Sequence, residues 1–187
     1  MTQQRVFLTH GFGPFYDKHS RLLILGSFPS VKSREQGFFY GHPRNRFWPL
    51  LALLCGETTP QSVEKKKDFL RRHRIALYDV IESCSIVGSS DSSIRDVTPA
   101  DLRPILAGSR VGTRIFTNGG RASALYAKYL LPTLGIPSVP LPSTSPANAA
   151  LSLERLEERW GAVLAPILAG SAASATETAL PGQRSEI

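Results

Sequence analysis

Four short apolar segments, separated by stretches with helical periodicity, constrain the fold of this chain more than any other feature. The segments are residues 21–25, 75–78, 113–117 and 138–141. Short apolar runs that end near Gly, Pro, Asn, Asp or Ser are typical of buried strands. Strands that alternate with helices predict crossover connections and a mainly parallel sheet covered on both faces. Ligands of such α/β folds bind at the carboxyl ends of the strands, so the loops after these segments are the candidate site.

The stretches between the apolar segments carry helical patterns. Residues 47–55 are apolar on most faces, whereas residues 61–73 are amphipathic with a strongly basic face. A helix is expected to begin at residues 98–101, where a threonine precedes a proline and an acidic residue. Further helices are expected over residues 121–131 and from Ser145–Pro146 through Leu164.

The length and a change in composition predict one domain with a tail. The chain has 187 residues, and a length of about 150 residues per domain is a usual starting point. From residue 165 onward the sequence is rich in small residues and lacks aromatic residues. This composition indicates a fraying helix end followed by a flexible segment. We therefore expect a folded domain over residues 1–165 and a flexible tail over residues 166–187.

The charge balance favours an anionic partner. The chain has 22 Lys and Arg against 15 Asp and Glu, giving a formal net charge of +7. The expected tail contributes −1, so the remaining body carries +8. A basic domain suits nucleic acid or an acidic membrane surface, and an otherwise ordinary basic protein is the alternative.

Several classes of protein are disfavoured by the sequence. No apolar run approaches the roughly 18 residues of a membrane helix, and the first ten residues lack the features of a secretory signal. Two cysteines, Cys55 and Cys84, cannot form a four-cysteine zinc or iron–sulfur site, and their spacing predicts reduced thiols. Scattered histidines and the absence of P-loop and GxGxxG motifs predict no metal and no cofactor. We expect a cytoplasmic protein that does not contact membranes.

Two segments near the first strand carry candidate site residues. Residues 26–30 (GSFPS) form a tight turn whose backbone N–H groups could hold an anion, although a plain strand-to-loop turn is favoured when this segment is taken alone. Residues 36–49 (QGFFYGHPRNRFWP) are the most informative part of the chain. Aromatic residues of such a loop can stack on a base, and Arg44 and Arg46 can contact phosphate or a carboxylate. Asn45 carries a donor and an acceptor, so it can hold a water and a ligand together, or cap a helix.

Three later segments add polar candidates. Asn118 ends the third strand and could read a hydrogen-bonding edge, with neighbouring glycines allowing close approach; a helix cap is about equally compatible. The hydroxyls of residues 141–148 (LPSTSPAN) suit a DNA phosphate, and a proline-rich connector with a Ser145 cap is the alternative. Asp79 and Glu82 could form a carboxylate pair, but the sequence does not show that they face each other.

Taken together, these loops resemble the uracil-DNA glycosylase superfamily. The matching motifs are GSFPS (26–30), FFYGHPRNRFW (38–48), TNGGRA (117–122) and LPSTSPAN (141–148), in this order. The further runs LYDV (77–80), SC (83–84) and GSSDSSI (88–94) resemble the hypoxanthine-DNA (deoxyinosine) glycosylase branch, family six. The resemblance covers residues 20–165 and implies a three-layer α/β/α sandwich with a central four-stranded parallel sheet. It also implies hydrolysis of the N-glycosidic bond of a damaged base flipped out of DNA, without metal or cofactor.

The resemblance also implies roles for individual residues. Many members place Asp or Asn before the proline of the first motif to position the attacking water, but this chain has Phe28 there. The deoxyinosine branch is similar in lacking that residue and is thought to use the Asn of the HPRN run, which is Asn45 here. Tyr40 matches the aromatic residue that stacks on the base. The other implied contacts are Gly26, Ser27 and Phe28 in the pocket wall, Asn118 and Ser143 at the substrate, and Arg44, Ser145 and Asn148 on DNA.

The expected function is therefore excision of a deaminated base, hypoxanthine or uracil, from DNA in base excision repair by a monomeric enzyme. The alternative is a non-catalytic nucleic-acid-binding protein on the same fold, because Phe28 stands where many members have the residue that positions the water. An enzyme of free nucleosides or nucleotides is a third option, which the basic body disfavours. The basic residues 65–67 and 71–74 are either further contacts to the DNA backbone or a solvated helix face.

Overall fold

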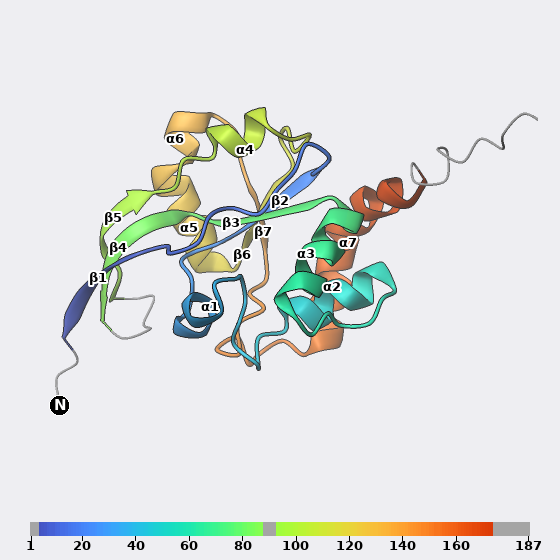
Figure 1. The fold of residues 1–187 in the computed structure, drawn as a ribbon, viewed down its shortest axis with the longest axis horizontal. Helices are drawn as coiled ribbons and strands as arrows, with labels where there is room; N and C mark the ends of the chain where they lie inside the picture. The colour runs from blue at the N-terminus through green and yellow to red at the C-terminus, as the bar shows by residue number, and fades with distance from the viewer. Residues whose placement is uncertain (1–3, 88–92, 174–187) are drawn as a thin grey trace, which may run out of the picture.

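The four predicted strands form one parallel sheet in the computed structural model, which describes residues 4–87 and 93–173 (Figure 1). The strands are β2 (Leu22–Gly26), β3 (Ile75–Asp79), β6 (Ile115–Asn118) and β7 (Val139–Leu141), in the order β3-β2-β6-β7. All neighbours in this sheet are parallel. The predicted α/β class with a central four-stranded parallel sheet is confirmed.

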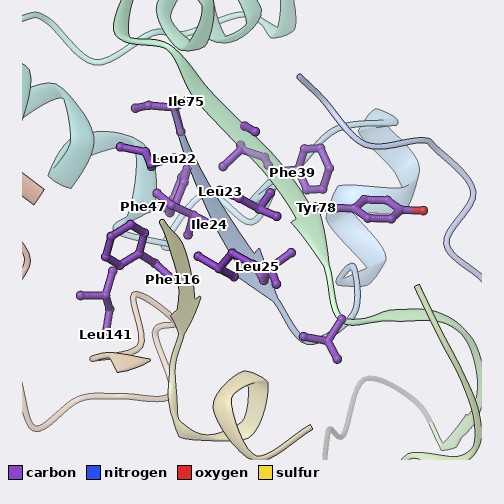
Figure 2. Close-up of a cluster of buried hydrophobic side chains, with 14 of the residues drawn as sticks. Leu22, Leu23, Ile24, Leu25, Phe39, Phe47, Ile75, Tyr78, Phe116 and Leu141 are labelled. Carbon is purple, nitrogen blue, oxygen red and sulfur yellow. The ribbon is translucent and has the colours of Figure 1, made fainter. Parts of the chain in front are cut away.

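The sheet is held by the apolar residues that predicted its strands. Every residue of β2 and β3 is buried, and Figure 2 shows the β2 leucines and Ile24 among aromatic side chains from neighbouring elements. Full burial of one such side chain stabilises the fold by about 1.5–3 kcal/mol. Neither strand therefore has an exposed face, as expected for a parallel sheet that is covered on both sides.

Helices cover the parallel sheet on both sides (Figure 1). The helices α2 (Phe47–Cys55), α3 (Val63–His73) and α7 (Leu153–Ala173) lie together on one side, whereas α5 (Gly120–Tyr129) and α6 (Leu131–Leu134) lie on the other. The remaining helices, α1 (Val31–Gln36) and α4 (Arg103–Ala107), are short. The predicted three-layer arrangement is thus confirmed.

Two predicted helix starts are wrong. Residues 98 and 99 belong to the strand β5 (Arg95–Pro99), an edge strand that tolerates the proline, and α4 begins only at Arg103. Ser145 does not begin the last helix, because its side chain accepts a hydrogen bond from the backbone of Ala147 in a local turn. Instead, Ser152 accepts from the backbone N–H of Arg155, and α7 follows it.

A second, antiparallel sheet was not predicted. It consists of β1 (Arg5–Thr9), β4 (Ile81–Val87) and β5 in the order β1-β4-β5. The edge strands β1 and β5 are almost entirely exposed, and the β4–β5 pairing is irregular. Exposed strands lack the apolar run or strict alternation by which strands are identified in a sequence. Residues 88–92 of the hydroxyl-rich segment between β4 and β5 lie outside the described residues.

The last helix continues beyond the predicted domain boundary. Helix α7 extends to Ala173, and Leu168 on it is buried in the core. We therefore propose that the domain ends at Ala173 rather than at residue 165; residues 174–187 of the predicted tail lie outside the described residues. No helix within residues 4–87 and 93–173 combines the length and apolar character needed to cross a bilayer.

The topology places a crevice between β2 and β6. The chain leaves β2 toward β3 at one edge of the sheet and leaves β6 toward β7 at the other edge. Loops that diverge from adjacent parallel strands open a crevice at their carboxyl ends, where ligands of α/β folds bind. The strand register aligns Gly26 with Asp79, and Asn118 with Leu141, at this edge.

A buried hydroxyl in the sheet gives a prediction for stability. Thr117 is fully buried, and its Oγ1 makes no hydrogen bond within the described residues. Replacing Thr117 by valine should raise the free energy of unfolding by about 1 kcal/mol, since it removes an unsatisfied polar group while keeping the branched shape. Urea unfolding of the two proteins measures this difference, and a destabilised T117V protein would contradict it.

Candidate active site

The carboxyl ends of the parallel strands border a cavity of about 340 Å³. Its walls come from the loops after β2 and β6, from residues 39–45 before α2 and from residues 143–146 after β7. All predicted site residues except Arg44 and Asn148 line it, namely Gly26, Ser27, Phe28, Tyr40, Asn45, Asn118, Ser143 and Ser145. The cavity therefore brings together segments that are more than a hundred residues apart in the sequence.

Asn45 is held by two hydrogen bonds to its side-chain oxygen. The backbone N–H of Phe47 donates to Oδ1 over 3.0 Å, and the hydroxyl of Thr144 donates to the same oxygen over 2.9 Å. An N–H can only donate, so Oδ1 must face Phe47 and the amide cannot be turned around. Because both lone pairs of Oδ1 are used, Asn45 has its Nδ2 hydrogens left for the cavity. The residue thus contributes to the start of α2 and also lines the cavity.

Asn118 forms a reciprocal pair with Thr144. Its Oδ1 accepts from the backbone N–H of Thr144 over 3.0 Å, and its Nδ2 donates to the Thr144 hydroxyl over 2.9 Å. The alternative interpretation of Asn118 as a helix cap is not supported, since Gly119 occupies the N-cap position of α5 without a side-chain bond. One lone pair of Oδ1 and one hydrogen of Nδ2 remain for a ligand.

Arg46 fixes the loop that carries Thr144. Its guanidinium donates to the backbone oxygens of Thr144 (3.4 Å), Ser145 (2.8 Å), Asn148 (2.7 Å) and Leu151. The sequence suggested a phosphate or carboxylate as its partner, but the guanidinium donates its hydrogen bonds to the backbone carbonyls of one loop instead. Trp160 on α7 adds a hydrogen bond from its indole to the oxygen of Pro142 over 2.9 Å. The loop is therefore held from two helices of the same layer.

The two predicted DNA contacts outside the cavity differ in character. Arg44 is exposed beside the cavity residue His42, whose Nδ1 accepts from the Arg44 backbone N–H. The side chain of Asn148 donates to the oxygen of Ser143 over 2.9 Å, so it stabilises the loop instead of facing the cavity. The structure thus leaves Arg44 available for an external partner and gives Asn148 a role within the loop.

Tyr40 has a strained backbone and a buried hydroxyl. Its φ is 53°, in the left-handed region that costs a tyrosine about 1–2 kcal/mol. One face of the ring stacks on Phe47 with centroids 3.7 Å apart. The hydroxyl makes no hydrogen bond within the described residues. Its pKa is raised above its ordinary value by burial and then by the charge of Asp79, and the nearby Asn118 amide partly opposes this rise.

Asp79, which the sequence suggested only as a possible partner of Glu82, reaches the cavity beside Tyr40. Asp79 is buried at the end of β3, and its Oδ2 lies 2.8 Å from Nε2 of the fully buried His10. The other ring nitrogen of His10 contacts the backbone oxygen of Phe12 and must carry a hydrogen, because a carbonyl only accepts. Asp79 Oδ1 passes so close to Gly26 that a Cβ there would lie 2.3 Å away. The absence of a side chain at Gly26 therefore allows the carboxylate its position.

Asp79 and Glu82 do not form the carboxylate pair that the sequence left open. Glu82 instead accepts a hydrogen bond from the Tyr78 hydroxyl. Together with burial, this contact raises the pKa of Tyr78 above its ordinary value. Of the two carboxylates, Asp79 alone lines the cavity.

Phe28 is almost fully buried in the cavity wall, where Arg34 lies 5.8 Å above its ring. Such a residue supplies an apolar surface and cannot orient water. The polar groups of the cavity come instead from other residues, among them Tyr40, Asn45, Asp79 and Asn118.

The basic face of α3 lies away from the cavity. Most of its lysines and arginines pair with acidic neighbours or lie over aromatic rings; examples are Lys67 with Glu64, Arg71 with Asp68 and Lys66 over Trp48. None of the residues that line the cavity belongs to α3. The interpretation of this face as a solvated surface is therefore favoured over a DNA contact.

Sequence reasoning missed the place of Asp79 at the cavity and its contact with His10. It also missed Thr144 and the structural role of Arg46. Thr144 lies inside the LPSTSPAN segment, but three hydroxyls in a row give no sign of which one points inward. Asp79 follows a buried strand, and its position directly after an apolar run was the available signal. His10 gave no signal, because it directly follows β1, an exposed strand that the sequence did not predict.

Comparison with known proteins supports one family. The family model described as the uracil DNA glycosylase superfamily matches residues 14–164. A protein of Methanosarcina acetivorans named hypoxanthine DNA glycosylase is 36% identical over 157 residues, covering 83% of this chain and 98% of that protein. A protein of Methanosarcina barkeri with the same name is 32% identical over 152 residues, covering 80% and 94%.

A solved structure gives the same result. The solution NMR structure of an M. acetivorans protein described as a candidate uracil DNA glycosylase is similar, with a TM-score of 0.71 and 35% identity. The match covers 87% of this chain and 99% of the other chain. The similarity therefore extends over most of the chain.

Proposed function

This chain belongs to the uracil DNA glycosylase superfamily, and from that premise we propose that it hydrolyses the N-glycosidic bond of hypoxanthine flipped out of DNA. The two curated relatives are named hypoxanthine DNA glycosylase, and this chain aligns with nearly their whole length. The observation that carries the proposal is the cavity at the strand ends, in which Asn45 has a fixed amide orientation. This activity belongs to base excision repair, and it needs an extruded nucleotide.

The polar groups of the cavity distinguish hypoxanthine from adenine. Hypoxanthine presents a ring N–H next to a carbonyl, whereas adenine presents a ring nitrogen acceptor next to an amino group. Asp79 Oδ1 can accept from the ring N–H, and the Tyr40 hydroxyl, which lacks a partner within the described residues, can donate to the carbonyl. Adenine would place its ring nitrogen, an acceptor, against the Asp79 carboxylate, which also only accepts, and an unpaired buried group disfavours a substrate strongly. Uracil and xanthine share the N–H and carbonyl, so they are expected as weaker substrates of the same site.

Asn45 acts in this proposal by placing the water. Cleavage builds positive charge on the sugar and negative charge on the departing base. A water molecule that accepts a hydrogen bond from Asn45 Nδ2 keeps a second lone pair for the sugar carbon. An amide is no strong base, so the contribution of Asn45 is position. In this arrangement Tyr40 meets the base through its hydroxyl and not by the stacking that the resemblance implied, and the apolar surface of Phe28 would help to exclude other water.

The DNA strand would run across the rim of the cavity. Ser143 and Ser145 line it from the loop after β7, and their hydroxyls can donate to the phosphates that flank the flipped nucleotide. Arg34 and Arg121 also line the cavity, and Arg44 is exposed beside it. Positive charge at these positions would neutralise phosphate, so binding should weaken as salt rises.

A panel of oligonucleotides tests the proposal. Single- and double-stranded DNA with one deoxyinosine, uracil, xanthine or normal adenine is incubated with excess enzyme, and abasic sites are revealed by alkaline cleavage. We expect product from deoxyinosine, less product from uracil and xanthine, and none from adenine. Binding of all DNAs without product would instead identify a non-catalytic binding protein. Release of hypoxanthine from free inosine but not from DNA would identify a nucleoside hydrolase.

A further inference from the structure

We propose that Thr144 is a positioning residue that holds Asn45 and Asn118 in their reactive orientations through one hydroxyl group. This role rests on the proposed function, and it explains how the residues of that site are held in place. The hydroxyl accepts from Asn118 Nδ2 and donates to Asn45 Oδ1, each over 2.9 Å. It thus links Asn118, which would contact the base, to Asn45, which would place the water.

The hydrogen bonds that link Asn118, Thr144 and Asn45 each have a fixed direction, because a backbone N–H determines the acceptor at both ends of the series. The N–H of Phe47 requires Asn45 Oδ1 as its acceptor, and the N–H of Thr144 requires Asn118 Oδ1 as its acceptor. Asn118 therefore has its Nδ2 turned toward the hydroxyl, whose own hydrogen can go only to Asn45. The amide of Asn45 receives two donors, which leaves its own donors for the reacting groups.

Thr144 borders the cavity, but its hydroxyl hydrogen is not available to a substrate. The residue is fully buried, and its hydroxyl hydrogen and one lone pair are engaged by the two asparagines. An effect of Thr144 on excision must therefore pass through those asparagines. A hydroxyl is the one small side-chain group that donates and accepts at the same point, so valine has the shape and lacks the function.

The loop around Thr144 does not depend on that hydroxyl. The backbone oxygen of Thr144 accepts from the N–H and from Nε of Arg46, and its backbone N–H donates to Asn118. Trp160 holds the loop at Pro142. Replacing Thr144 by valine should leave the loop in place and free only the two amides.

The test compares T144V with T144S, which keeps the hydroxyl. Single-turnover excision of deoxyinosine by T144V should be about tenfold to a hundredfold slower than by wild type, while its affinity for the same DNA changes less than about threefold. T144S should recover most of the rate. T117V is the matched control, because it removes an equally buried hydroxyl that has no partner within the described residues, and it should excise at the wild-type rate.

A double-mutant cycle separates positioning from a general structural effect. In the Asn45→Ala background one of the two targets of the hydroxyl is gone, so adding T144V should cost much less than in wild type. An equal loss in both backgrounds would overturn the proposal. So would a T144V protein as fast as wild type.

A measurement without catalysis completes the test. Side-chain amide resonances of Asn45 and Asn118 in ¹H–¹⁵N spectra should shift, and their hydrogens should exchange faster, in T144V but not in T117V. Unchanged resonances would overturn the role of Thr144, even if no base were excised. An inactive wild type with shifted resonances in T144V would instead contradict the proposed function and leave the positioning role supported.

Discussion

Replacing Asn45 by alanine is expected to slow the excision of deoxyinosine by about 100-fold to 1,000-fold, the usual cost of removing one aligned donor from an active site. The reason is that Nδ2 of Asn45 is the donor that its fixed amide leaves for the cavity. Binding of the DNA should stay nearly unchanged, since flanking phosphates supply most of it. Single-turnover rates at saturating enzyme measure the first effect, and fluorescence anisotropy measures the second.

A control is needed because Asn45 also accepts a hydrogen bond at the start of α2. Losing such a bond should lower the free energy of unfolding by about 1 kcal/mol. Ser62 accepts a similar bond from Lys65 at the start of α3, away from the cavity. Ser62→Ala should therefore lose similar stability and keep the wild-type rate. Excision by N45A at the wild-type rate, or an equally slow S62A protein, would refute the assignment.

Replacing Arg46 by methionine should produce the largest loss of stability, about 3–4 kcal/mol. The arginine donates four charged hydrogen bonds to backbone oxygens of residues 144–151, and such bonds stabilise by about 1.5–3 kcal/mol each before water replaces some of them. Methionine keeps part of the apolar stem and removes every donor. Urea unfolding monitored by tryptophan fluorescence provides the measurement.

Arg44→Met is the matched control for this change. Arg44 is exposed two positions away, and its side chain makes no hydrogen bond or ion pair within the described residues. Its replacement should shift the free energy of unfolding by less than about 0.5 kcal/mol. If both variants lost the same stability, the clamp formed by Arg46 would have no special role. If R46M were as stable as wild type, the hydrogen bonds to the loop would be shown to be replaceable by water.

Much of the fold could be predicted because its central part is apolar in sequence. The strands β2, β3, β6 and β7 were found within one to two residues of their ends. The helices α3 and α5 were also predicted, since each carries a periodic apolar face, and α2 was predicted from a run that is apolar on most faces. The antiparallel sheet was missed because β1 and β5 are exposed, and the start of α7 was misplaced because Ser145 and Ser152 are equally plausible caps.

The sequence predicted which residues form the candidate site better than it predicted what each residue does there. Most of the residues singled out in the loops line one cavity, because the loops follow parallel strands whose ends meet. Arg46 shows the limit of that reasoning. Its sequence position suits a phosphate contact, yet backbone carbonyls from a loop about a hundred residues later occupy its guanidinium.

The sequence by itself determined the class of fold, the motifs and the residue types of the site. Apolar runs and turn residues act locally along the chain, so they are legible without a structure. Only the tertiary structure decided that Asp79 reaches the cavity, that Thr144 joins two asparagines, and that Asn45 has its donors left for the cavity. Asn45 and Thr144 are 99 residues apart. The direction of a hydrogen bond depends on which donors the fold brings to each oxygen, and no local pattern contains that information.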